Sequence, residues 1–115
     1  MQIQELPLLS RFDSKRHVHV PVFLGQRTKV LLLCLASGQE VLPHRHPGFE
    51  ITLQPLRGKA ELPLPDGTKA LLTPGMFIAV EDGDFPFNPS NPFEENFEML
   101  IHLIKTDNKQ TTNTQ

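Results

Sequence analysis

The chain is 115 residues long, with a formal net charge of −2, 21% charged residues and 38% hydrophobic residues. This length leaves room for one domain with a single modest core. The balanced charge argues against binding to nucleic acid, and no apolar run reaches the length of a membrane span. Because the first residues lack the basic start and apolar core of a signal peptide, we expect a cytoplasmic protein that does not contact a membrane.

Eleven prolines and seven glycines divide the chain into short segments. No proline-free segment shows a helical stripe of apolar residues flanked by capping residues. Short segments separated by frequent turns are typical of all-β domains, so we expect an all-β, antiparallel fold.

The N-terminal residues 1–16 are expected to form an arm, whose apolar residues 6–9 pack on the main domain or on a partner subunit. His17 and His19 follow and alternate with valines, which predicts a strand. These two histidines form a His-x-His pair, but no carboxylate follows at a distance suited to a shared metal. We therefore interpret them as an exposed strand face or a subunit contact, rather than as metal ligands.

Residues 28–36 are almost uniformly apolar. Leucine favours helix, so a short helix is the alternative, but Gly38 closes the run and we predict a strand buried on both faces. The lone Cys34 lies within this run and is expected to be a buried, inert thiol. Residues 39–46 and 49–56 are the next two predicted strands.

Four further strands are expected, at residues 58–64, 68–73, 76–80 and 97–105. Pro65-Asp66-Gly67 has the chemistry of a tight hairpin turn, because proline presets φ, aspartate bonds the local backbone and glycine accepts a left-handed conformation. Residues 106–115 contain no apolar side chain and are expected to be a disordered tail.

The most informative stretch contains His44, His46 and Glu50. In an extended strand His44 and His46 project to the same side, roughly 6–7 Å apart, and could converge on one ion. Pro47-Gly48 allows a bend that could return the Glu50 carboxylate to the same point. Two imidazoles and one carboxylate suit Fe(II), Mn(II), Ni(II), Zn(II) or Cu(II). The alternative is that the histidines belong to a solvated, mildly basic patch.

The spacing of Gly38, His44, His46, Glu50 and Gly58 resembles the first conserved motif of the cupin superfamily. The run LLLCLASGQEVLPHRHPGFE is similar to the corresponding segment of small bacterial single-domain cupins, and the resemblance covers residues 28–105. It implies an RmlC-like jelly-roll barrel, or double-stranded β-helix, over residues 17–105. It also implies that His44, His46 and Glu50 bind a divalent transition metal (Fe, Zn, Mn or Ni).

This chain departs from the cupin pattern in two places. The interval from Glu50 to Gly58 is one residue longer than usual and contains Pro55, which predicts a bulge in that strand. In the second motif Gly83 aligns with the family glycine, but the position of the expected histidine falls on Pro86 or Phe87. Neither residue can bind a metal.

Four further side chains are predicted to line the mouth of the barrel. Phe85 and Phe87 would make it more apolar, and Thr52 shares a strand face with Glu50. His102 could replace the missing metal ligand, with a core or interface histidine as the alternative.

Three functions are compatible with these features. The first is a barrel that holds one divalent metal, with the oxygenase or isomerase chemistry that the resemblance implies. The second is a metal-free barrel that binds or senses a small apolar molecule, oriented by His44 and His46. The third is a structural role as a homodimerisation unit, with the arm and residues 17–24 supplying the contact. Elemental composition of the native protein would separate the first from the others.

Overall fold

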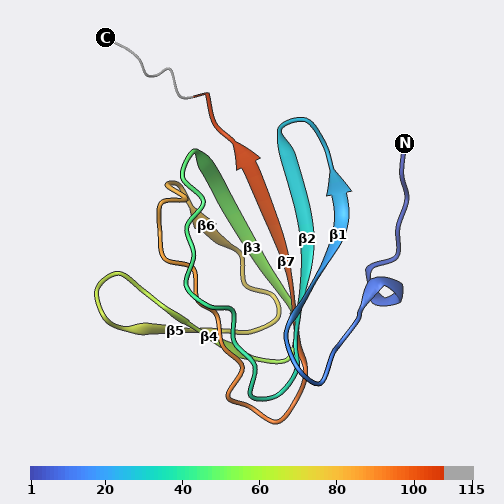
Figure 1. The fold of residues 1–115 in the computed structure, drawn as a ribbon, viewed down its shortest axis with the longest axis vertical. Helices are drawn as coiled ribbons and strands as arrows, with labels where there is room; N and C mark the ends of the chain where they lie inside the picture. The colour runs from blue at the N-terminus through green and yellow to red at the C-terminus, as the bar shows by residue number, and fades with distance from the viewer. Residues whose placement is uncertain (108–115) are drawn as a thin grey trace.

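The structure is a computed structural model that describes residues 1–107 (Figure 1). These residues form one short 3-10 helix, η1 (Leu6–Leu9), and seven strands. The strands are β1 (Val18–Leu24), β2 (Thr28–Leu35), β3 (Phe49–Arg57), β4 (Ala60–Pro63), β5 (Lys69–Leu72), β6 (Ile78–Val80) and β7 (Phe97–Lys105). Five strands make one antiparallel sheet in the order β1-β2-β7-β3-β6, and β4 pairs with β5 in a separate hairpin. The predicted all-β, antiparallel fold is confirmed.

The large sheet is built on the apolar strand β2, which pairs with β1 on one side and β7 on the other. The prediction of a strand rather than a helix over residues 28–36 is therefore confirmed. On β3 the pairing with β7 shifts register between Pro55 and Arg57, so the bulge expected at Pro55 is present. The bulge lets β3 accommodate a residue that cannot donate a backbone hydrogen bond.

The second layer faces this sheet and contains the β4–β5 hairpin together with two long loops. The hairpin turn is the one predicted at residues 65–67, where the Asp66 carboxylate accepts hydrogen bonds from the backbone and hydroxyl of Thr68. The strand expected over residues 39–46 is wrong, because this segment makes only isolated bridges, Glu40 with Ser90 and His44 with Phe87. Prolines on both segments remove the donors that a continuous ladder needs.

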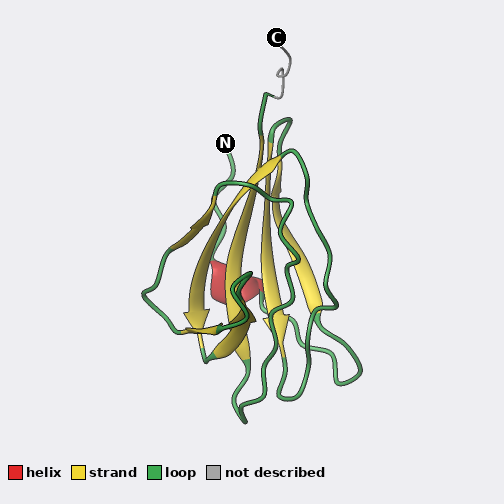
Figure 2. Ribbon diagram, turned by 90° about the vertical axis from the view of Figure 1, so that its left-hand side faces the viewer, coloured by secondary structure: helices red, strands yellow, loops and turns green. Residues whose placement is uncertain are grey.

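The main hydrophobic core lies between the two layers and includes thirteen buried residues. The outer face of the sheet carries a smaller cluster, Val20, Leu32 and Cys34, against which Leu9 and Phe12 of the N-terminal segment pack. In Figure 2 the short helix lies behind the strands and the long loops pass in front of them. The arm therefore covers part of the sheet face that points away from the core.

A polar contact fastens the same segment to the sheet. The Ser10 hydroxyl donates to one carboxylate oxygen of buried Glu98 at 2.7 Å, and Arg57 donates to the other at 2.8 Å. Within residues 1–107, no helix is long and apolar enough to cross a membrane.

The C-terminal prediction covers residues 106–115, of which residues 108–115 lie outside the described part of the chain. Thr106 continues the sheet end by donating its backbone N–H to the Gly48 carbonyl at 2.9 Å, and Asp107 pairs with Arg27 at 2.7 Å. These two residues are therefore tied to neighbouring loops.

Gly58, the glycine of the first motif, offers a test of the fold. Its φ is +76°, and an added Cβ would collide with the carbonyl oxygen of Asn96. We expect Gly58→Ala to lower the free energy of unfolding by about 2–5 kcal/mol, because the left-handed conformation and the collision both destabilise the folded state. Gly67→Ala is the matched control, since φ is +88° there but the space around Cβ is open, and should cost about 1–2 kcal/mol. Equal losses in urea unfolding would contradict the proposed close approach at Gly58.

Candidate ligand pocket

A pocket of about 300 Å³ lies between the large sheet and the long loops. Three imidazoles and five apolar side chains line it: His19, His44, His46, Leu31, Ile51, Phe87, Ile101 and Leu103. The volume is at the small end of the range for ligand sites, about 300–1,000 Å³.

His44 and His46 lie side by side on the loop wall of the pocket, as the His-x-His spacing predicts. Their ring centroids are 4.6 Å apart, with the ring planes at 82°. Nδ1 of His44 lies 3.0 Å from the carbonyl oxygen of Leu42. Because a carbonyl can only accept, Nδ1 carries the hydrogen, and Nε2 is the acceptor when the ring is neutral.

The backbone of Gly83 holds His46 in place. The His46 N–H donates to the Gly83 carbonyl at 2.7 Å, and the Gly83 N–H donates to the Phe49 carbonyl at 2.8 Å. An added Cβ at residue 83 would collide with the carbonyl oxygen of His46. The loops approach each other this closely because residue 83 has no side chain.

Glu50 does not join the two histidines in this structure. It is exposed, whereas the next residue, Ile51, is buried and lines the pocket. The cause is the register of β3, in which Ile51 lies opposite the pocket residue Leu103 and Glu50 opposite Ile104. Neighbouring residues of a strand face opposite sides, so Glu50 is turned away.

Of the four other residues predicted to line the pocket, one does so and three do not. Phe87 lines the pocket and is 3% exposed. Its ring lies edge-on to the His44 ring, with the two ring centroids 5.7 Å apart. Phe85 packs against the main core instead. Thr52 and His102 are register partners on the outer face of the sheet, next to the pocket residues Ile51, Ile101 and Leu103 in sequence. Nδ1 of His102 is buried and has no hydrogen-bond partner among the described residues.

His19 is the pocket residue that sequence analysis misassigned, because it was interpreted as part of an exposed face or a subunit contact. It lies opposite the core residue Leu33 in the β1–β2 register, so its ring points inward. The alternation with Val18 and Val20 carried this signal, because Val20 is buried on the other face. What the sequence did not show is which face of β1 would meet the loops.

The surroundings of His19 and His46 favour the neutral forms of their rings. Burial, followed by the nearby His17, His44 and His46, lowers the pKa of His19 from 6.5 to about 4. Burial also lowers the pKa of His46, with smaller contributions from His44 and Lys29. Desolvation disfavours the charged form of a base, so these two rings are neutral at physiological pH.

The side chains around the pocket do not fit the expected metal centre. A two-His, one-carboxylate site needs an acid where the structure has Ile51, and a fourth ligand would fall where it has Phe87. Among residues 1–107, no three His, Cys, Asp or Glu side chains are grouped closely enough to hold a metal ion. The donor set therefore resembles a polar end wall of a ligand pocket more than a complete metal centre.

Comparison with solved structures identifies the fold. The TT1209 protein of Thermus thermophilus superposes with a TM-score of 0.84 at 26% sequence identity, over 93% of this chain and 100% of that chain. A Klebsiella pneumoniae protein with a double-stranded β-helix domain gives 0.82 at 20% identity, over 93% and 92% of the two chains. An RmlC-like cupin from Desulfovibrio desulfuricans gives 0.78 at 20% identity, over 90% and 96%.

No family model and no curated protein matches the sequence. The structural matches nevertheless agree with the resemblance carried by the first motif. The chain has a double-stranded β-helix fold, similar to that of the RmlC-like cupin.

The lowered pKa of His19 predicts acid sensitivity. The unfolded chain protonates this ring near pH 6.5, whereas the folded protein keeps it neutral down to about pH 4. Unfolding therefore takes up a proton between these values, and stability falls as the pH is lowered through this window. Between pH 7 and pH 5 we expect His19 to contribute a loss of about 1–2 kcal/mol, reduced where solvent reaches the ring.

Urea unfolding of His19→Gln at both pH values is the measurement. The variant should lose less stability than the wild type on acidification, whereas Leu71→Gln, at an exposed position on β5 that carries no titratable group, should show the pH dependence of the wild type. A His19→Gln protein with the full wild-type pH dependence would contradict the buried, neutral imidazole.

Proposed function

We propose that this protein binds a small, mainly apolar molecule in the pocket, and that His19, His44 and His46 orient its polar end. The observation that carries the proposal is the composition of the pocket wall. Five of its eight side chains are apolar, and the polar groups are imidazoles confined to β1 and the loop of residues 44–46. An apolar pocket with a few convergent polar groups is the usual form of a small-molecule site.

The hydrogen-bonding character of the histidines supports the same function. A neutral imidazole offers one donor and one acceptor, and Nδ1 of His44 is already used by the Leu42 carbonyl. Nε2 of His44 is thus available to a bound molecule. Imidazole nitrogens that are shielded from water discriminate well between ligands, because a ligand that fails to pair with them leaves a buried polar atom unsatisfied.

Filling the pocket tests this proposal. Leu31 lines the pocket on β2, and Leu31→Trp should occupy part of its volume. We expect saturation-transfer NMR with molecules the size of indole and benzamide to show binding to the wild type and at least a tenfold loss in this variant, because the site is sterically blocked. Leu71→Trp is the matched control, since Leu71 is 49% exposed on β5 and does not line the pocket. Equal binding by all three proteins would place the site elsewhere.

A divalent transition metal held by imidazoles is the second candidate. The adjacent rings of His44 and His46 favour it, and the lowered pKa of His46 keeps that ring in the metal-binding neutral form. These imidazoles lack the carboxylate of the two-His, one-carboxylate centre that an oxygenase or isomerase of the expected kind would use. Fe, Zn, Mn or Ni would here depend on imidazoles alone.

Elemental analysis of protein purified without an affinity tag separates the two candidates. We expect less than one metal ion per chain, and no rise in melting temperature on adding Fe(II), Zn(II), Mn(II) or Ni(II). His44→Ala should then weaken small-molecule binding without altering metal content, and Glu50→Gln should change neither, because Glu50 is exposed. Stoichiometric metal that disappears in His44→Ala would support the imidazole metal site. Metal that disappears in Glu50→Gln would contradict the placement of Glu50.

A further inference from the structure

Lysine side chains stand directly beyond the pocket on the same face of the sheet. On β2, Lys29 lies two residues from the pocket residue Leu31, and on β7, Lys105 lies two residues from Leu103. Alternate residues of a strand share a face, so both lysines belong to the pocket side. Lys29 and Leu103 are also register partners.

The two lysines line a second hollow of about 170 Å³. Phe49 of β3 lines it too, and Phe49 lies two residues from the pocket residue Ile51. On each of three neighbouring strands, a residue of this hollow therefore lies on the same sheet face as an apolar pocket residue and two positions from it. The hollow is the rim of the pocket, and a molecule longer than the pocket would extend into it.

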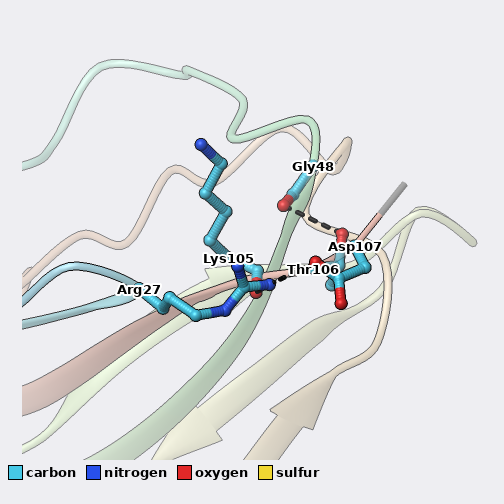
Figure 3. A network of polar contacts seen from close by, with 5 residues as sticks. All are labelled: Arg27, Gly48, Lys105, Thr106 and Asp107. Atoms are coloured by element: carbon cyan, nitrogen blue, oxygen red, sulfur yellow. Dashed lines mark hydrogen bonds and ion pairs between the residues drawn. The ribbon is translucent and has the colours of Figure 1, made fainter. Parts of the chain in front are cut away.

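Two arginines near this end of the sheet are already paired. Arg27 forms an ion pair with Asp107 at 2.7 Å, and Arg45 pairs with Asp84 at 3.3 Å. Figure 3 shows the Lys105 side chain extending away from Asp107, whereas the Arg27 guanidinium lies beside Asp107. Within residues 1–107, neither Lys29 nor Lys105 forms an ion pair.

Among residues 1–107, no acidic side chain lines either the pocket or the hollow. A cationic ligand would find no counter-charge there. A polyphosphate would not be matched by the mainly apolar wall. The combination suits a ligand with one negative charge at one end and an apolar body at the other.

We infer that the ligand is a small organic acid, whose apolar body fills the pocket and whose carboxylate reaches Lys29 and Lys105 at the rim. This inference rests on the proposed small-molecule function and names the chemical class of the ligand. The imidazole of His46 lies on the opposite wall and can donate a hydrogen bond to the polar part of the same molecule.

Matched pairs of acid and amide test this inference. Hexanoate is compared with hexanamide, and benzoate with benzamide, by titration calorimetry or NMR at low salt. We expect at least one acid to bind the wild type about tenfold more tightly than its amide, the gain typical of one charge-assisted hydrogen bond. Lys29→Gln with Lys105→Gln should remove most of this preference and leave amide binding unchanged. Lys69→Gln is the matched control, because Lys69 is exposed on β5 beside Glu61.

The outcomes separate the inference from the function on which it rests. If amides bind as tightly as acids, or if the double lysine variant keeps the preference for acids, the inference is wrong and the small-molecule function stands. If neither acids nor amides bind the wild type at millimolar concentration, the inference and the small-molecule function are both contradicted. A preference for acids that disappears with the two lysines and survives in Lys69→Gln supports both.

Discussion

The register of β3 against β7 is the constraint on which the site depends. It places Ile51 opposite Leu103, inside the barrel, and sends Glu50 to the outer surface. Because side chains alternate strictly along a strand, a shift of one residue would exchange the two. Such a shift would also expose Leu53 and bury Gln54, so the hydrophobic core opposes it. An acid and an aliphatic residue are adjacent in sequence, and packing decides which one faces the histidines.

The histidines themselves are held by contacts between loops. Backbone hydrogen bonds join His44 to Phe87 in both directions, and His46 to Gly83. Prolines interrupt these segments, so the pairing forms isolated bridges instead of a strand. The result is a wall that is fixed at a few points and carries polar side chains, opposite a rigid sheet that supplies the apolar wall. Binding groups on loops supported by a scaffold are common in small-molecule sites.

Keeping imidazoles neutral in an apolar pocket costs stability in acid, which the rest of the structure must offset. The offsetting terms are the continuous core between the layers and the smaller cluster on the outer face, which the N-terminal arm completes with Leu9 and Phe12. In the function proposed above, the same desolvation would make the pocket selective, since each polar atom within it needs a partner. Stability in acid and recognition of a ligand would then depend on one property of the site, the burial of its imidazoles.

The sequence by itself determined the local features. Its turn residues and apolar runs predicted the all-β class, β2 as a strand, the hairpin at residues 65–67 and the bulge at Pro55. Its spacing predicted that His44 and His46 share one side. The tertiary structure decided which partners those residues meet: Ile51 in place of Glu50, and His19 from the far edge of the sheet. Local rules depend on neighbours in the chain, whereas these outcomes depend on the register between distant strands, which is selected by the packing of the whole core.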